Sequence, residues 1–232
     1  MEIRATAFNG DIAAINTEAL VIFVFEDETN PFDQFPTSPT GFPAPGPFDP
    51  INDAMDGAIA NLIDAKEITG KRGEITVIHT LGKMVSDRVV VVGCGKANDF
   101  TSEALRRVVA SVCRRLRAIK VASVSIYPEA IIWHKMEHHK NAREDMVDNF
   151  YQDIAEGAIL GLYRFTKHFS KEDVDVEPNI VEIICLDLQS DLLIDDGLDN
   201  VQSLIDEGII IAKSTILARD MVNEPSNFMT PG

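Results

Sequence analysis

The sequence predicts an α/β fold in which a largely parallel sheet is covered by helices on both faces. Segments with the pattern of strands alternate with segments of helical periodicity, which is the arrangement of such sheets. One strand segment, residues 20–25, is apolar throughout and has the composition of a strand buried on both faces. With 232 residues, 45% of them hydrophobic and 25% charged, the chain is long enough to bury a core without disulfides or a structural metal.

Two strands open the chain, at residues 3–8 and 20–25. Residues 29–50 then hold seven of the eleven prolines, interleaved with four phenylalanines. Proline fixes φ and removes a backbone donor, so this density predicts an extended loop. We interpret it as a surface loop held to the body by its phenylalanines, and a proline-rich recognition segment or a lid is the alternative.

Regular structure resumes after the loop. Asn52 or Asp53 is expected to cap the first helix and Thr101 or Ser102 the second, with Glu103 well placed in its first turn. The apolar spacing predicts these elements in order: helix 52–64, strands 74–79 and 88–92, helix 101–116, strand 121–126, helix 142–165, strand 180–188 and helix 199–223.

The last helix is apolar over more than one face. Most of its apolar residues form one stripe, but Ile210 and Ile211 broaden it, so the helix is expected to need partners on more than one side. Apolar surface is expected to be exposed near Ile210, Met221 and Val222. The stripe itself comprises Val201, Leu204, Ile205, Ile209, Ala212, Ile216 and Leu217.

The charge is strongly acidic, with 21 Lys and Arg against 37 Asp and Glu and a net charge of −16. Such a chain repels phosphate backbones and anionic lipid, so we expect neither nucleic acid nor membrane as a partner. Acidic residues concentrate in residues 171–207, and basic residues on and just after the helix at 101–116. We interpret both as solvated faces, and a subunit contact between them is the alternative.

The compartment is expected to be the reducing cytoplasm. Cys94, Cys113 and Cys185 lie in apolar contexts and their odd number argues against a disulfide framework, so buried, inert thiols are predicted. The N-terminus has no signal-peptide pattern, and the apolar run at residues 208–212 is too short to span a bilayer.

Two motifs suggest chemistry. Gly93-Cys94-Gly95 follows a buried strand, as in a phosphate-binding turn, but Asn98 stands where the third glycine of G-x-G-x-x-G belongs, so we interpret it as a tight strand-to-helix turn. His134, Glu137 and His138 match the H-x-x-E-H zinc motif. Their surroundings are polar and no third ligand is identifiable downstream, so we interpret them as part of a solvated connector. We therefore assign no catalytic, cofactor-binding or metal-binding residue to this chain.

Several segments together resemble the leucyl aminopeptidase (cytosol aminopeptidase) family in its N-terminal domain. The resemblance extends from about residue 3 to residue 232, with the motifs in matching order and spacing. They are GKRGE at 70–74, RVVVVG at 88–93 followed by Gly95-Lys96, Phe100 and EALRR at 103–107, AEGAILGLYRF at 155–165, and ARDMVNEPSN at 218–227 followed by Thr230-Pro231.

The resemblance implies a macro-like mixed sheet with helices on both sides, a long helix ending in Tyr163-Arg164-Phe165, and a C-terminal linker helix. It divides the chain into an N-terminal domain at 1–195 and, at 196–232, the linker helix with the start of a catalytic domain. Gly157 and Gly161 would leave a smooth stripe for close helix packing. The family's metal-binding signatures, G-x-T-x-D-x-G-G and N-T-D-A-E-G-R, do not occur here, so no metal or catalytic residue is carried over.

The implied activity belongs to a longer enzyme that removes N-terminal residues from peptides. In it, two divalent metal ions (Zn²⁺ or Mn²⁺) polarise the carbonyl and activate a bridging water, and the subunits form a homo-hexamer. This chain would contribute to assembly and access and would be inactive alone, with no cofactor of its own. The alternatives are a freestanding macro-like module for an ADP-ribose-type ligand, and a zinc peptidase built on the H-x-x-E-H motif.

Overall fold

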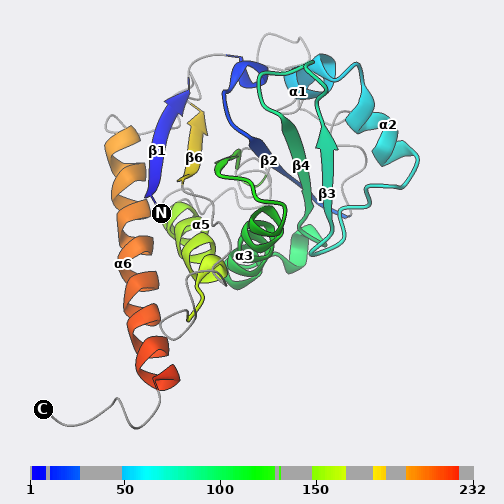
Figure 1. The fold of residues 1–232 in the computed structure, drawn as a ribbon. Helices are drawn as coiled ribbons and strands as arrows, with labels where there is room; N and C mark the ends of the chain where they lie inside the picture. The colour runs from blue at the N-terminus through cyan, green and yellow to red at the C-terminus, as the bar shows by residue number, and fades with distance from the viewer. Residues whose placement is uncertain are drawn as a thin grey trace, which may run out of the picture.

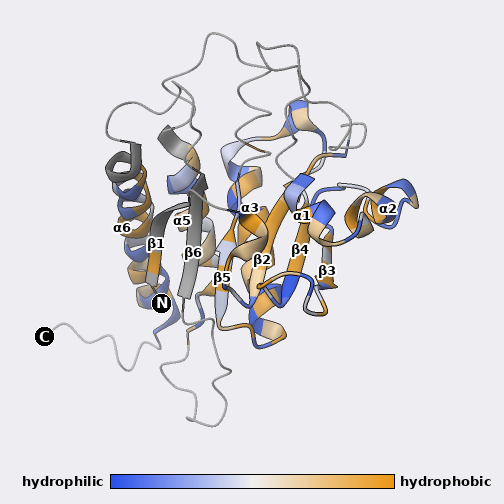
Figure 2. Cartoon of the chain, turned by 90° about the horizontal axis from the view of Figure 1, so that it is seen from above, coloured by the Kyte–Doolittle hydropathy of each residue, from blue (hydrophilic) through white to orange (hydrophobic). Residues whose placement is uncertain are grey.

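The structure, a computed structural model, describes residues 2–8, 11–26, 49–128, 131, 148–165, 180–186 and 197–224. They contain a six-stranded sheet with the strand order β1-β6-β5-β2-β4-β3, which Figure 2 shows across the view. Strand β3 is antiparallel to β4 and the other pairs are parallel, which confirms the expected mixed α/β sheet. The strands are β1 (Glu2–Phe8), β2 (Ala19–Val24), β3 (Ile75–His79), β4 (Arg88–Gly93), β5 (Ser123–Ile126) and β6 (Ile180–Leu186).

Helices cover both faces of this sheet, as Figure 1 shows. Helices α3 (Ser102–Ala118), α5 (Asp148–Leu162) and α6 (Gly197–Asn223) lie on one face, with α6 against α5 and the edge strand β1. Helices α1 (Asp49–Ala54) and α2 (Ala58–Asp64) pack on the other face. Two short 3₁₀ helices, Ile12–Ala14 and Ala97–Asp99, precede β2 and α3.

Strand β2 shows why its sequence is apolar throughout. Successive side chains of a strand point to opposite faces. Val21 and Phe23 therefore join the core under α3, α5 and α6, while Leu20 and Ile22 join the core under α1 and α2. All four side chains are fully buried. The predicted burial of this strand on both faces is confirmed.

The helix expected at residues 52–64 is in fact two helices. Asp56 (φ 53°) and Gly57 (φ 78°) both adopt left-handed backbone conformations, which a right-handed helix cannot continue through. The capping role given to Asn52 or Asp53 was wrong as well, because both residues lie inside α1. The Oδ1 atom of Asn52 instead accepts a hydrogen bond of 3.1 Å from the backbone N–H of Ala60, in the first turn of α2.

Other boundaries move by a few residues. Thr101 caps α3 as expected, since its Oγ1 accepts a 3.2 Å hydrogen bond from Ala104 N–H. Strand β5 begins at Ser123, not at residue 121, and α6 begins at Gly197, not at residue 199. Helix α5 ends at Leu162, not at residue 165, and its expected start at 142–147 lies outside the described residues. The expected proline-rich loop also lies outside them, except that residues 49–50 already belong to α1.

The contact between α3 and α5 is closer than ordinary side chains permit. A Cβ atom added at Gly157 would lie 2.7 Å from the carbonyl oxygen of Arg106, and one at Gly161 would lie 2.5 Å from Cα of Ala110. The two glycines therefore allow the backbones to meet, as the sequence predicted. This packing places the end of α5, and with it α6, at a fixed position on the sheet.

Candidate functional site

The turn at Gly93-Cys94-Gly95 has no backbone donor left for a phosphate. The N–H of Gly93 donates to Glu74 O (2.9 Å), that of Cys94 to Val24 O (2.9 Å), and that of Gly95 to Gly70 O (2.8 Å). A phosphate-binding turn needs such N–H groups to be free to point at the ligand. The interpretation as a tight turn between strand and helix agrees with this geometry.

Residues 69–73, which we call the plug segment, lie over the carboxyl ends of β2 and β4. Helices α1 and α2, which follow β2 in the sequence, and α3, which follows β4, pack on opposite faces of the sheet. In open α/β sheets that point is where ligands bind. Here the plug segment occupies it: a Cβ atom at Gly93 would lie 2.0 Å from Lys71 O, and one at Gly70 would lie 2.4 Å from Phe25 O.

Side chains hold the plug segment at both ends. Glu74 Oε2 accepts hydrogen bonds from the N–H (2.9 Å) and the hydroxyl (3.0 Å) of Thr69. Arg72 donates from Nη2 to Asp99 O (2.9 Å) and from Nε to Cys94 O (3.4 Å). Beside the segment is a half-open pocket of about 290 Å³ lined by Phe25, Lys66, Ile68 and Lys71 among others; both lysines are exposed. The point where open α/β sheets bind ligands is therefore filled by the chain itself.

The described residues offer no metal centre. Among them there is no group of three His, Cys, Asp or Glu side chains that could hold a metal ion. The H-x-x-E-H motif at His134, Glu137 and His138 lies outside the described residues, so its expected role as a solvated connector stays a prediction. Within the same described ranges, no helix is both long and apolar enough to cross a membrane.

Two of the three cysteines are buried and unreactive in character. Cys94 and Cys113 are free thiols at 0% and 1% exposure. Burial raises the pKa of the Cys113 thiol to about 12, against the opposing charges of Arg114 and Arg117. Such a thiol remains protonated at neutral pH and is a poor nucleophile. The side chain of Cys185 is not among those that the structure describes, so its predicted burial stays a prediction.

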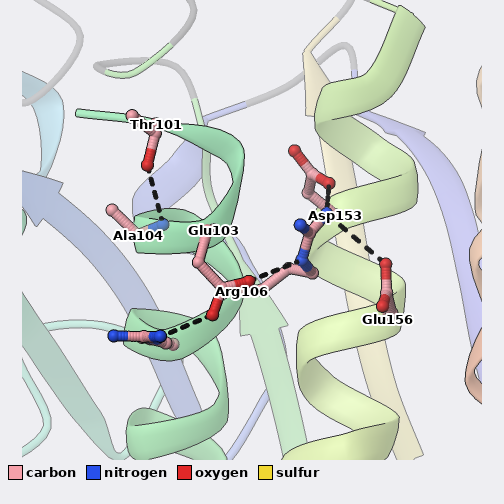
Figure 3. Close-up of polar contacts among 7 residues, drawn as sticks. Thr101, Glu103, Ala104, Arg106, Asp153 and Glu156 are labelled. Carbon is pink, nitrogen blue, oxygen red and sulfur yellow. Dashed lines mark hydrogen bonds and ion pairs between the residues drawn. The ribbon is translucent and has the colours of Figure 1, made fainter.

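A charged cluster joins α3 to α5, as Figure 3 shows. Arg106 Nη1 lies 2.5 Å from Asp153 Oδ1 and 3.5 Å from Glu156 Oε2, and its Nε lies 3.4 Å from Glu103 Oε2. The Asp153 side chain is only 2% exposed, and its Oδ2 has no hydrogen-bond partner in the described structure. Partial burial acts to lower the pKa of Arg106, but the Asp153 and Glu156 carboxylates outweigh it and raise the pKa. The cluster therefore joins α3 to α5 through ion pairs.

A second polar contact, which we call the Tyr163 junction, fixes the end of α6. The Tyr163 hydroxyl donates to Asp220 Oδ1 (2.6 Å) and accepts from Asn223 Nδ2 (3.3 Å), while the Arg219 guanidinium lies 5.8 Å from the ring centroid. The hydrogen bond to Asp220 raises the pKa of Tyr163, and burial adds to this. Sequence reasoning missed the contact. The signal available was that its members belong to two of the motifs that carried the resemblance, 155–165 and 218–227.

The side of α6 that faces away from α5 exposes large apolar side chains. Ile210 is 63% exposed, Met221 52% and Val222 84%, as the sequence predicted for this helix. Leu217 was wrongly placed in the packing stripe, because it is 58% exposed. Its neighbour Ile216 takes the packing position against the core.

Comparison with known proteins shows similarity to cytosol aminopeptidases. The family model for the N-terminal domain of the cytosol aminopeptidase family matches residues 44–172. A probable cytosol aminopeptidase of Alkaliphilus metalliredigens is 33% identical over 181 residues, covering 78% of this chain and 33% of that protein. One of Sulfurihydrogenibium is 29% identical over 227 residues, covering 98% of this chain and 38% of that protein. The chain thus spans between a third and two fifths of the length of these relatives.

Solved structures share the fold. A mutant of tomato leucine aminopeptidase superposes with a TM-score of 0.67 at 16% identity, covering 99% of this chain and 40% of that one. The bottromycin maturation enzyme BotP in complex with Mn superposes with a TM-score of 0.53 at 19% identity, covering 93% of this chain and 34% of that one.

Proposed function

The chain belongs to the cytosol aminopeptidase family, and we propose that it is the non-catalytic N-terminal part of a metal-dependent enzyme that removes N-terminal amino acids from peptides. The observation that carries the proposal is the match of the family's N-terminal domain model to residues 44–172, in a chain that spans only 33% to 38% of the length of the relatives it matches. We place the domain at residues 1–195 and the linker helix, with the start of the catalytic part, at 196–232.

The chemistry would lie in the remaining part of the enzyme. The described residues do not fit a pair of divalent metal ions, since they offer no cluster of three ligands. No step of the reaction is therefore assigned to this chain. The bottromycin maturation enzyme, a structural neighbour, has been solved with Mn, which supports Mn²⁺ or Zn²⁺ as the metal of the whole enzyme. The name of the family supports a cytoplasmic location.

The role left to this chain is assembly and control of access in a homo-hexamer with a macro-like outer domain. The occupied crevice over β2 and β4 supports this role over that of a freestanding ADP-ribose-type module, because the plug segment takes the place of a ligand. The chain has a hydrophobic core on each face of its sheet, which supports the proposal that it folds without the catalytic part.

The test compares two purified proteins, this 232-residue chain and the polypeptide encoded by the whole gene. With Mn²⁺ or Zn²⁺ added, hydrolysis of leucine-p-nitroanilide is expected only from the longer one. Turnover by the 232-residue chain that survives repurification would overturn the proposal. So would an inactive longer polypeptide, or a gene that ends at codon 232.

A further inference from the structure

Helix α6 has two sides with opposite surroundings. On one side, Val201, Ile205 and Ala212 are at most 5% exposed and belong to the core with α5. On the other side, the last four turns expose a set of apolar side chains that we call the distal face. The distal face consists of Ile210, Ile211, Leu217, Ala218, Met221 and Val222.

The spacing of the distal face makes it one continuous surface. Ile210, Leu217 and Met221 are separated by seven and then four residues, and Ile211, Ala218 and Val222 repeat that spacing one position later. Residues at these intervals lie along one side of a helix. From residue 210 to residue 222 the face is about 18 Å long at 1.5 Å per residue. Large exposed apolar faces of this kind mark interaction sites.

The polar residues within this face are already satisfied. The hydroxyl of Ser214 donates to Ile210 O at 2.8 Å, and that of Thr215 donates to Ile211 O at 3.0 Å. Neither hydroxyl would therefore lose a hydrogen bond if a partner excluded water. Their small side chains also let a partner approach the helix closely. The distal face is thus suited to a contact from which water is excluded.

The distal face is held in a defined orientation. The Tyr163 junction ties its last turns to the end of α5 through the 2.6 Å hydrogen bond between Tyr163 and Asp220. Arg117 in turn donates to the last carbonyl of α5, Leu162 O, at 2.9 Å. In Figure 1, the C-terminal turns of α6 extend past α5, away from the sheet. The distal face is therefore available to a partner that packs against the C-terminal turns of α6.

We propose that the distal face docks an apolar surface of the catalytic part of the same polypeptide, an inference that rests on the proposed function. Relatives extend far beyond the matched region, which is 33% or 38% of their length. The distal face lies at the C-terminal end of α6, which follows the residues matched by the model of the family's N-terminal domain. A tether raises the effective concentration of a partner to about the millimolar range. A tethered contact can therefore be smaller than the interface of a free dimer, which needs about 20–30 residues a side.

Met221 provides a native probe for this contact. It is 52% exposed in the 232-residue chain, whereas Met55 and Met84 are 4% and 6% exposed and serve as buried references. Methionine is oxidised to the sulfoxide according to its access to peroxide. Peptide mapping after a timed peroxide pulse is expected to show Met221 oxidised at least about fivefold more slowly in the whole-gene polypeptide than in the 232-residue chain. Equal rates in the two proteins would overturn the proposal.

A pair of variants separates docking from other effects. Leu217→Glu puts a charge in the distal face, and Leu81→Glu puts one at an 87% exposed leucine on the turn between β3 and β4. In the whole-gene polypeptide, Leu217→Glu is expected to restore fast oxidation of Met221, and Leu81→Glu is expected to leave it slow. A Met221 that stays protected in Leu217→Glu would overturn the proposal.

The outcomes also distinguish this inference from the proposed function. An active whole-gene enzyme with unprotected Met221 would refute docking and leave the function standing. A protected Met221 in an inactive polypeptide would do the reverse. If the 232-residue chain itself protects Met221 and sediments as a dimer, the occupant is a second copy, and the proposal is wrong.

Discussion

Replacing Arg106 by leucine should reveal how strongly the fold depends on the α3–α5 ion pair. The variant leaves the Asp153 carboxylate, 2% exposed, without its cation at 2.5 Å and with an Oδ2 atom that already lacks a partner. Removing one member of a buried pair typically costs about 3–5 kcal/mol. Because Arg106 is itself 29% exposed and partly screened by water, we expect the lower end, about 3 kcal/mol.

That loss is a large fraction of the stability of a domain, which is about 5–15 kcal/mol. Urea unfolding followed by circular dichroism would measure it as a shift of the midpoint at unchanged slope. The matched control is Arg107→Leu on the same helix, since Arg107 is 77% exposed and pairs with the exposed Glu103. It is expected to leave the midpoint almost unchanged.

The double variant Arg106→Leu/Asp153→Leu tests the physical cause. If the cost comes from an uncompensated buried charge, removing the charge as well should recover most of the stability. A loss below about 1 kcal/mol in Arg106→Leu would refute this account of the pair. So would a double variant no more stable than the single one.

Three further variants test other contacts. Gly161→Ala should lower the urea midpoint, because the added Cβ atom would lie 2.5 Å from Cα of Ala110 and force α3 and α5 apart. This overpacking costs about 1–3 kcal/mol of stability, which outweighs the gain of about 1 kcal/mol from the higher helix propensity of alanine. A variant more stable than the original chain would contradict this. The free energy of unfolding should fall as the pH rises from about 9 to 12. In this range the Cys113 thiol, with a pKa of about 12, stays protonated in the folded chain, whereas the same thiol in the unfolded chain, with a pKa near 9.0, loses its proton. Cys113→Ala should therefore make the stability less dependent on pH in this range. Tyr163→Phe removes the hydroxyl that donates to Asp220 and should speed amide hydrogen exchange in residues 217–223 while exchange in α3 stays unchanged. Unchanged exchange in residues 217–223 would show that the Tyr163 junction does not stabilise the end of α6.

Much of the fold could be predicted because its causes are local in the sequence. The unbroken apolar run of β2 predicts burial on both faces, Thr101 predicts a helix start, and Gly157 with Gly161 predicts close helix packing. Each depends on residues a few positions apart, where backbone geometry relates spacing directly to direction. The order and spacing of short motifs likewise sufficed to identify the family.

The candidate surfaces were decided by tertiary structure, because their partners are distant in sequence. Asp153 meets Arg106 across 47 positions and Asp220 meets Tyr163 across 57, and no periodicity encodes either pair. Leu217 fits a helical stripe by spacing, yet it is exposed, because α5 covers only one side of α6. Apolar spacing also could not reveal the break at Asp56 and Gly57, because it does not encode the left-handed backbone conformations of these two residues. The sequence by itself determined which faces are apolar, and only the packing of the helices decided which of those faces the domain buries and which it leaves for a partner.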